Sequence, residues 1–258
     1  MNFDMKLIDT ILTDFIRNET DRIGIKKAVI GLSGGVDSSV SAFLAAKALG
    51  SENVTGVMMP YKSSSKSSLT DAKKVVKSLG IKSKKIEITP MVDAYTENSG
   101  IKKFTPKRLG NIMARMRMIV LYDLSAMLDA LVIGTGNKTE AMLGYTTIYG
   151  DNACAINPLG DLYKSQVWEL AKYLGVPESI INKPPSADLW EGQTDEAEMG
   201  VRYKDVDRYL FYRYDEKMTE EELMKRGFTE DYINRIDSMV ERNKFKRSLP
   251  IVGRIYEE

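Results

Sequence analysis

One short segment of the chain combines glycines, hydroxyl groups and a carboxylate in a pattern that suits phosphate binding. Residues 33–38 read SGGVDS and lie between a predicted strand and a predicted helix. In an open parallel sheet, this position turns free helix N–H groups and the positive end of the helix dipole toward an anion. Gly34 and Gly35 let the backbone curl around that anion, and Ser33 and Ser38 add hydroxyl donors. We therefore predict a phosphate-binding loop.

The carboxylate of this loop indicates which phosphate chemistry it serves. A Walker-type loop has a Lys directly before its Ser, whereas here Asp37 precedes Ser38. A negative charge beside phosphates is useful if it holds a cation, so Asp37 favours a hard metal ion such as Mg²⁺. The alternative is a plain Gly-Ser turn in which Asp37 caps the following helix.

The residue types that are missing exclude several classes of enzyme. Among 258 residues there is no histidine and one cysteine, Cys154. This composition excludes Ser-His-Asp and Cys-His catalysis, histidine-ligated zinc and an internal disulfide, and it fits a cytoplasmic protein. The net charge of +1 gives no general attraction to nucleic acid or to membranes, so we expect neither as a partner.

The elements that must position these groups alternate between strands and helices. Apolar runs predict strands at residues 27–32, 54–59, 85–88 and 131–133, and helical periodicity marks residues 5–17, 38–49, 69–79, 107–129 and 164–174. This alternation predicts an α/β fold, a doubly wound parallel sheet of about five strands with helices on both faces. The last ~60 residues have charged, helical patterns and predict a helical C-terminal extension without strands.

In this setting, the SGGVDS loop resembles the pyrophosphatase loop of the N-type ATP pyrophosphatases, whose fold is adenine nucleotide alpha hydrolase-like. Members of that superfamily adenylate an oxygen of their substrate, release pyrophosphate, and let a nitrogen or sulfur nucleophile displace AMP. Further segments, in order along the chain, resemble motifs of the NAD synthetase family: residues 111–118 (NIMARMRM), 134–140 (GTGNKTE), 147–151 (TIYGD), 157–159 (NPL) and 183–190 (KPPSADLW). The resemblance runs from about residue 5 to residue 250.

This resemblance implies an ammonia-dependent ligase that amidates deamido-NAD (nicotinate adenine dinucleotide) to NAD. The reaction consumes ATP, passes through an adenylated carboxylate, and releases AMP and pyrophosphate. The resemblance also implies a single NAD synthetase domain over residues 1–258, made of an N-terminal helix (1–20), an ATP-pyrophosphatase core (21–190) and the helical extension (191–258).

The expected nitrogen source is free ammonia or an outside partner, because the resemblance leaves no room for a glutaminase domain. Cys154 lies in the apolar stretch Ala-Cys-Ala. That setting is typical of a packed thiol rather than a nucleophile.

By the same resemblance, Asp37 and Glu140 bind Mg²⁺, which bridges the ATP phosphates, and Lys164 contacts those phosphates as a point charge. The alternative for Glu140 is a solvated helix carboxylate, and the alternative for Lys164 is a surface lysine that opens a helix. The residues expected to contact ATP are Gly31, Leu32, Ser33, Gly34, Gly35, Val36, Asp37, Ser38, Thr135, Lys164 and Ser186.

Residues for the acyl substrate also follow from the resemblance. Arg115, Phe245 and Lys246 match positions that contact deamido-NAD; the alternative for Arg115 is a salt bridge on its long helix. Asp151 matches a carboxylate proposed to take a proton from ammonium, which must lose one before it can act as a nucleophile. As an Asp that follows a Gly, it could equally shape a turn.

Three positions depart from the commonest pattern of the family. Ile148 stands where many members have Lys, Ala155 where many have Asp, and Phe245 where they have His. All three positions contact deamido-NAD in the common form. The departures therefore concern the acyl substrate and leave the ATP chemistry unchanged.

Two other functions remain open. Another N-type ATP pyrophosphatase would amidate or thiolate a different substrate, but thiolation needs a sulfur-carrying cysteine, and a nucleic-acid substrate favours a basic chain. A non-enzymatic nucleotide-binding module would keep the glycines but need not keep Asp37, Glu140 and Lys164 together.

The long helical pattern at residues 107–129 predicts how the chain assembles. Its apolar residues cover more than one stripe, whereas a single-faced surface helix needs an apolar arc of about 100°. We therefore expect a homodimer in which this helix packs near its own copy across a two-fold axis.

Overall fold

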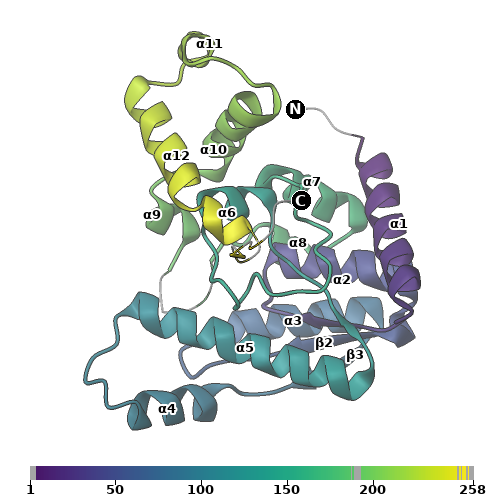
Figure 1. Cartoon of the computed structure of the whole chain (residues 1–258). Coiled ribbons are helices and arrows are strands. Elements are labelled where there is room, and N and C mark those ends of the chain that lie inside the picture. The colour runs from purple at the N-terminus through teal and green to yellow at the C-terminus, as the bar shows by residue number, and fades with distance from the viewer. Residues whose placement is uncertain are drawn as a thin grey trace.

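A parallel sheet lies at the centre of the molecule (Figure 1). The computed structural model describes residues 4–186, 188, 193–248, 250, 252, 253 and 255. Within them the strands follow the order β3-β2-β1-β4 and are β1 (Ala28–Gly31), β2 (Val54–Met58), β3 (Lys82–Lys85) and β4 (Leu131–Val132). From β1 the chain adds β2 and β3 on one side of the sheet and β4 on the other. Sheets of this kind bind their ligands at such a reversal of strand order, here between β1 and β4.

The α/β class is confirmed, but the described residues form four strands rather than about five. The chain returns to the sheet beyond β4, where Ile156 makes a single parallel bridge to Ile133. Pro158 follows two residues later, and proline has no N–H to donate to a ladder. The chain therefore touches the sheet at Ile156 without adding a strand.

The third strand begins earlier than the apolar pattern predicts. β3 covers Lys82–Lys85, and all its residues are exposed, whereas we expected residues 85–88. Charged side chains are common on edge strands because they discourage pairing with another chain. The apolar residues Ile86 and Ile88 follow the strand and pack into the core.

Helices cover both faces of the sheet because successive strand residues point to opposite sides. Ile30 packs with the helices of one face, and its neighbour Val29 packs with those of the other. The first face carries α1 (Met5–Ile23), α2 (Val36–Leu49), α3 (Lys66–Leu79), α7 (Lys164–Leu174) and α8 (Glu178–Ile181). The second carries α4 (Thr89–Asn98) and α5 (Pro106–Leu128).

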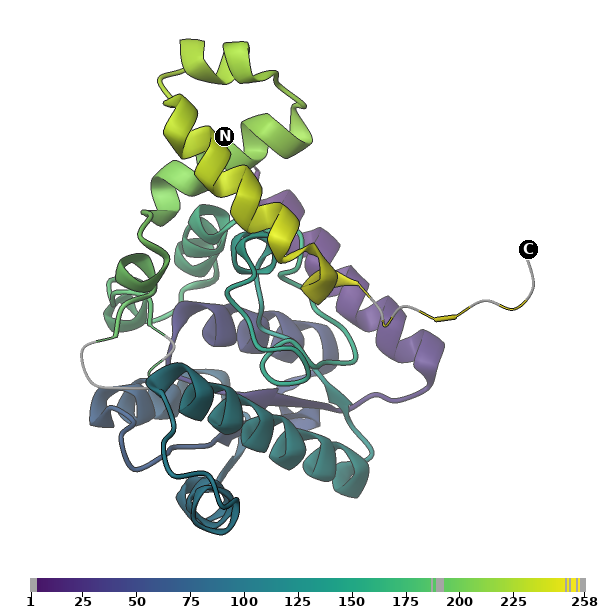
Figure 2. The ribbon, with the colours of Figure 1, turned by 60° about the vertical axis from the view of Figure 1, so that its left-hand side comes forward.

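A cluster of helices stands at one end of the sheet and has its own aromatic core (Figures 1 and 2). Tyr203 and Tyr209 are fully buried in it, and Trp168 of α7 packs against both this core and the core on the first face of the sheet. The cluster consists of α6 (Lys138–Leu143), α9 (Asp195–Met199), α10 (Tyr203–Leu210), the π-helix η2 (Phe211–Asp215), α11 (Glu220–Lys225) and α12 (Glu230–Arg242). Short 3₁₀ helices occur at η1 (Ser51–Asn53) and η3 (Lys244–Arg247).

The predicted helical extension is present, since residues 193–248 contain helices and no strand. The expected boundary at residues 190–191 lies outside the described residues, as do residues 1–3 of the expected N-terminal helix. None of the helices in the described part of the chain is both long enough and apolar enough to cross a membrane.

Candidate active site

The phosphate loop is folded by hydrogen bonds among its own groups. The hydroxyl of Ser38 donates to the carbonyl oxygen of Gly35 at 3.1 Å and accepts the N–H of Ser33 at 3.3 Å. Gly35 is the N-cap of α2, and no side chain caps that helix. The N–H groups at the start of α2 are therefore left for a ligand, as an anion site requires.

Gly34 is required both by its backbone conformation and by a close approach. Its φ is +78°, and a Cβ atom there would lie 2.2 Å from the carbonyl oxygen of Ser68. A larger residue would be strained in this left-handed conformation and would also collide with α3. Gly34 thus packs the loop against α3 and does not itself line the cavity described next.

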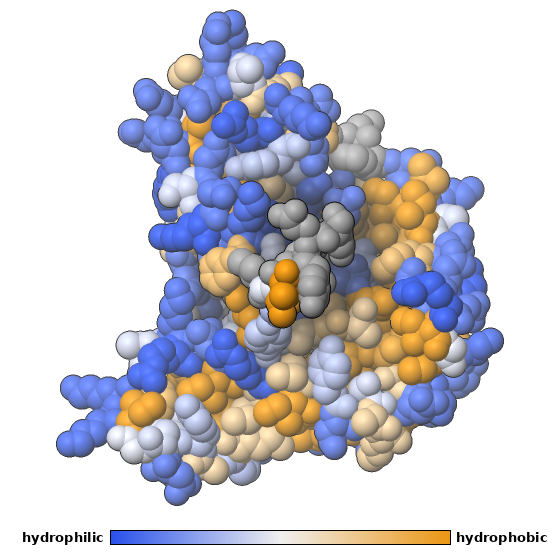
Figure 3. All heavy atoms as spheres, in the orientation of Figure 1, coloured by the Kyte–Doolittle hydropathy of each residue, from blue (hydrophilic) through white to orange (hydrophobic). Residues whose placement is uncertain are grey.

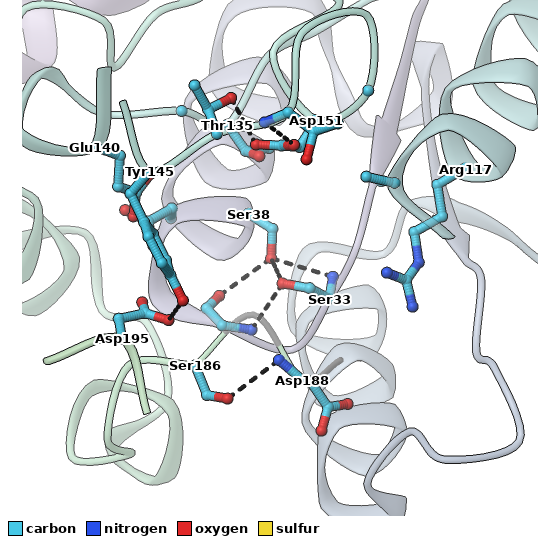
Figure 4. Close-up of a pocket in the computed structure, with 18 of the residues that line it drawn as sticks. Ser33, Ser38, Arg117, Thr135, Glu140, Tyr145, Asp151, Ser186, Asp188 and Asp195 are labelled. Atoms are coloured by element: carbon cyan, nitrogen blue, oxygen red, sulfur yellow. Dashed lines mark hydrogen bonds between the residues drawn. The ribbon is translucent and has the colours of Figure 1, made fainter. Parts of the chain in front are cut away.

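A cavity of about 540 Å³ opens at the carboxyl ends of β1 and β4 (Figure 4). This volume is typical of a small-molecule site. All but two of the predicted site residues line it: Gly31, Leu32, Ser33, Gly35, Val36, Asp37, Ser38, Arg115, Thr135, Glu140, Asp151, Lys164, Ser186 and Lys246. The exceptions are Gly34 and Phe245.

Lys164 lies at the centre of the charged part of the cavity. Its ammonium Nζ is 2.6 Å from Oδ2 of Asp37 and 3.1 Å from Oε1 of Glu140. The lysine is 2% exposed, and its Nζ lies 5.1 Å from the centre of the Tyr203 ring. Lys164 is thus a buried cation shared by two carboxylates, and not the surface lysine that the alternative interpretation assumed.

Burial and charge act in opposite directions on this cluster. Burial disfavours the charged form of Lys164, but the carboxylates of Asp37 and Glu140 outweigh it and raise the lysine pKa above its ordinary value. Burial also raises the pKa of Glu140 to about 7, an effect opposed by the charge of Lys164 and increased by that of Asp37.

Asn137 links the ends of β1 and β4. Its Nδ2 donates to Oδ1 of Asp37 at 2.9 Å, and its Oδ1 accepts the N–H of Glu140 at 2.9 Å. The Glu140 carboxylate in turn accepts the N–H of Asn137 at 3.4 Å. This reciprocal capping box fixes the start of α6 and so holds the Glu140 carboxylate beside Asp37.

Asp151 lies in the loop that connects α6 to α7. Its carboxylate accepts the hydroxyl of Thr146 and the N–H of Thr147, both at 2.8 Å. These are the contacts by which an Asp shapes a turn. Asp151 also lines the cavity, so its two expected roles are compatible in one position.

Two cations on the same side of the cavity are held by backbone carbonyl oxygens. Nε of Arg115 donates to the carbonyl of Ile148 at 3.3 Å. Nζ of Lys246 donates to the carbonyls of Gly144 at 2.7 Å and Thr146 at 3.0 Å. Neither forms an ion pair in the described part of the chain, so both charges remain available to an anionic substrate.

Comparison of the sequence and the fold with known proteins shows to which family the chain belongs. The family model described as NAD synthase matches residues 8–250. The chain belongs to the NAD synthase family. The NH3-dependent NAD+ synthetase of Fusobacterium nucleatum subsp. nucleatum is 49% identical over 255 residues, covering 99% of this chain and 98% of the relative.

Solved structures similar to this member of the NAD synthase family span nearly its whole length. A structure described as NMN synthetase from Francisella tularensis has a TM-score of 0.87 and 36% identity, covering 98% of this chain and 99% of the other. The NH3-dependent NAD synthetase of Campylobacter jejuni subsp. jejuni, in complex with the nitrate ion, has a TM-score of 0.83 and 36% identity, covering 98% and 100%.

The positions at which this NAD synthase family member departs from the common pattern differ in their surroundings. Ile148 lines the cavity, whereas Ala155 and Phe245 do not. Phe245 lies in η3, and 62% of its surface is exposed. Of the three departures, Ile148 is therefore the one that lines the cavity.

Several residues that line the cavity were not predicted. Arg117 faces it from α5, on the side opposite Glu140 and Tyr145 (Figure 4), and its Nε donates to the carbonyl of Met59 at 3.1 Å. The resemblance assigned Arg115 alone, and positions two apart on a helix do not normally share a face.

A second unpredicted group is the pair Tyr145 and Asp195. The Tyr145 hydroxyl donates to Asp195 at 3.1 Å and to Glu198 at 2.8 Å. All three residues line the cavity. They belong to segments about 50 residues apart in the chain, and no local pattern signals their contact.

Part of the KPPSADLW segment contributes to the same cavity. Ser186 and Asp188 line it, and the Asp188 carboxylate accepts the N–H of Ser65 at 3.1 and 3.2 Å. Lys183, Pro184 and Pro185 line the cavity as well, whereas Ala187, Leu189 and Trp190 lie outside the described residues.

Proposed function

We propose that this chain makes NAD from deamido-NAD, ATP and ammonia. The nicotinate carboxylate attacks the α-phosphorus of ATP, so that an acyl-adenylate forms and pyrophosphate leaves. Ammonia then attacks the acyl carbon, a C–N bond forms, AMP leaves, and one proton is released. The observation that carries this proposal is the meeting of the phosphate loop, Lys164 and the Asp37–Glu140 pair in one cavity of a NAD synthase family member.

In this proposal, ATP spans the cavity from an apolar part to the charged cluster. The N–H groups of α2 and the hydroxyls of Ser33 and Ser38 hold the phosphates. Lys164 neutralises charge on the departing pyrophosphate, and Thr135 and Ser186 add polar contacts. The side chains that suit the flat apolar surface of adenine are Leu32, Met58, Met59, Met118, Leu121 and Val132.

Asp37 and Glu140 are the proposed ligands of Mg²⁺. The described residues contain no group of three or more carboxylate or thiol side chains suited to a metal ion, but Mg²⁺ often uses one or two carboxylates and completes its shell with phosphates and water. The two carboxylates already converge on one cation, the Lys164 ammonium. When bound, Mg²⁺ would neutralise charge on the ATP phosphates.

Arg115 and Lys246 are the proposed contacts for the anionic deamido-NAD. Both cations line the cavity and have carbonyl partners that orient them without cancelling their charge. Phe245 lies outside the cavity but next to Lys246 in η3, so its proposed contact is with a part of deamido-NAD that extends beyond the cavity. Asp151 is the proposed acceptor of the proton that ammonium loses.

Free ammonia is the proposed nitrogen source, and the reducing cytoplasm is the proposed location. Burial raises the pKa of the Cys154 thiol, which opposes a role as the nucleophile of a glutaminase. Within the described residues, the thiol donates one weak hydrogen bond, to the carbonyl of Asn152 at 3.8 Å.

We further propose that the working unit is a homodimer. Large apolar side chains are exposed on two helices: Leu7 and Ile11 on α1, and Ile119, Tyr122 and Met127 on α5. Apolar atoms gather on the right of Figure 3 over α1 and along its lower part over α5. Exposed apolar groups of this kind favour a contact with a second copy of the chain.

One assay tests the proposed reaction and its rivals. The purified chain, with ATP, Mg²⁺, deamido-NAD and ammonium, is expected to form NAD, AMP and pyrophosphate in equal amounts, and glutamine should not replace ammonium. Pyrophosphate release with a different acid but none with deamido-NAD would indicate another ATP pyrophosphatase. ATP binding without pyrophosphate release under any condition would indicate a binding module.

A second candidate substrate is nicotinate mononucleotide, which the same chemistry would amidate to NMN. The observation that favours it is the similarity to the structure described as NMN synthetase, at a TM-score of 0.87. Rates measured with deamido-NAD and with nicotinate mononucleotide at equal concentrations separate the two. We expect deamido-NAD to be preferred, because the relative that is 49% identical is named an NAD+ synthetase.

A further inference from the structure

We infer that Asp207, a fully buried carboxylate outside the cavity, is a positioning residue that fixes where Glu140 and Lys164 lie relative to each other. Asp207 lies on α10 in the C-terminal helical cluster and is 0% exposed. It does not line the cavity, so it has no direct contact with substrate. This inference rests on the proposed roles of Glu140 and Lys164 in binding Mg²⁺ and the ATP phosphates.

The two oxygens of Asp207 hold two different helices at once. Oδ1 accepts the hydroxyl of Thr139 at 2.6 Å, and Oδ2 accepts the N–H of Ser165 at 2.7 Å. Thr139 directly precedes Glu140 in α6, and Ser165 directly follows Lys164 in α7. Each contact is therefore one residue away from a member of the charged cluster.

Thr139 closes this arrangement into a ring. Its hydroxyl donates to Asp207 and also accepts the backbone N–H of Lys164 at 3.0 Å. The first N–H groups of α7 thus find acceptors on α6 and α10, where a negative charge near a helix N-terminus is also favourable. Thr139 is 0% exposed, so water cannot readily replace a lost partner.

The geometry explains why this ring matters for the site. α6 is a short helix, Lys138–Leu143, and short helices have little stability of their own. The Lys164 ammonium must reach carboxylates on both α2 and α6, at 2.6 and 3.1 Å. A small shift between α6 and α7 would therefore move Glu140 relative to Lys164, and misplacement by about 1 Å can reduce a rate by roughly 10².

The test compares Asp207→Asn with a matched control, Asp237→Asn. Asn has one carbonyl oxygen and cannot accept both the Thr139 hydroxyl and the Ser165 N–H as the carboxylate does. Asp237 is also a carboxylate of the helical cluster; it accepts bonds from Tyr209, Arg213 and Tyr214. It touches neither α6 nor α7 through these bonds.

Both variants are expected to fold and to lose similar amounts of thermal stability. Asp215 accepts bonds from Lys138 and Tyr163, and this second tie should keep the Asp207→Asn variant folded, although it does not hold Thr139 and Ser165 themselves. Asp207→Asn should lower kcat on the order of 10²-fold, weaken binding of ATP with Mg²⁺, and speed amide hydrogen exchange at Lys164 and Ser165 in the ligand-free protein. Asp237→Asn should leave all three near wild type.

A conservative pair at Thr139 tests the same ring from the other side. Thr139→Ser keeps the hydroxyl and should keep most of kcat. Thr139→Val removes the hydroxyl at nearly equal side-chain volume, and its kcat should fall as much as that of Asp207→Asn. The double variant Thr139→Val with Asp207→Asn should be little worse than either single variant, because both remove one coupled interaction.

The outcomes separate this inference from the proposed reaction. Equal effects of Asp207→Asn and Asp237→Asn on kcat, or strictly additive effects of the Thr139 and Asp207 variants, would overturn the positioning role. A wild-type chain that forms no NAD would overturn the proposed reaction instead. In that case ATP binding and hydrogen exchange still decide about Asp207: unchanged values in Asp207→Asn would reject it, and weakened binding with faster exchange would support it.

Discussion

Glu140 illustrates how one residue can satisfy a local rule and a distant one. Locally it is the reciprocal partner of Asn137 in the capping box that starts α6. Its other oxygen accepts a hydrogen bond from the ammonium of Lys164, which is 24 positions away in the chain. The first role fixes the second, because the cap sets where the carboxylate points.

The substitution Glu140→Gln separates these two roles. Gln also serves in a capping box, so the fold should be retained, but its single carbonyl oxygen cannot accept both the Asn137 N–H and the Lys164 ammonium as the two carboxylate oxygens do. Its neutral amide is a poor ligand for Mg²⁺, and we expect kcat/KM to fall on the order of 10²–10³-fold. Steady-state rates across a range of Mg²⁺ concentrations, with thermal unfolding as a check of the fold, measure this. Near-wild-type rates in a folded variant would remove Glu140 from the metal site.

Cys154 is expected to be unreactive near neutral pH. Burial raises its pKa, so it has less thiolate at about pH 7 than a free thiol of pKa ~8.5. Alkylation of Cys154 by iodoacetamide, followed by mass spectrometry, should therefore be slow near neutral pH. Its rate should still increase at a pH at which a free thiol is already fully ionised and reacts no faster. Cys154→Ala should keep ammonia-dependent activity. Rapid alkylation near neutral pH would show that the thiol is activated.

At the scale of elements, the phosphate loop depends on how α2 and α3 approach each other. Gly34 permits this approach because it has no side chain and adopts φ +78°. The chain offers a matched control in Gly24, which caps α1 at φ +83° and has no atom within 4 Å of an added Cβ. The two glycines share the conformational strain that a substitution brings, and only Gly34 faces a collision.

Gly24→Ala should therefore destabilise the fold by about 1–2 kcal/mol, the cost of a left-handed conformation for an L-residue, without changing ATP binding. Gly34→Ala should destabilise it more and should also weaken ATP binding, because relief of the collision with Ser68 displaces the loop. Urea denaturation gives the two free energies of unfolding, and titration calorimetry gives the ATP affinities. Equal values for the two variants in both measurements would contradict the close packing of loop and α3.

At the scale of the whole molecule, the proposed dimer rests on exposed apolar residues of α1 and α5. Ile119 is 52% exposed, whereas Met116 packs against the core, so Ile119 is the residue to change. Ile119→Asp should turn the dimer into monomers without disturbing the core, and it should weaken deamido-NAD binding more than ATP binding if the substrate lies near the two-fold axis.

A control for general surface effects is Met224→Asp, since Met224 is 47% exposed on α11 in the helical cluster. That variant should remain dimeric in sedimentation velocity. A wild-type chain that sediments as a fully active monomer at assay concentrations would end the dimer proposal.

The fold class and the glycine-rich loop after β1 could be predicted from local patterns, because a strand, a glycine-rich turn and a helix in succession are typical of phosphate sites in parallel sheets. Most of the cavity lining was predicted through the resemblance to the NAD synthetase family. The bounds of the edge strand β3 could not be predicted from the sequence. Its residues Lys82–Lys85 are exposed and show no apolar pattern, and they form a strand because they pair with β2.

The direct pairing of Lys164 with two carboxylates could not be predicted from the sequence, because it depends on how the helices pack. Lys164 pairs with Asp37, 127 positions away, and with Glu140, 24 positions away, and the lysine is consequently buried rather than solvated. Arg117 and Asp195 line the cavity for the same reason; Arg117 belongs to the motif at residues 111–118, but that motif alone does not show that its side chain reaches the cavity. Electrostatic contacts depend on distance in space and on burial, and the chain sets both only after its helices have packed on the sheet.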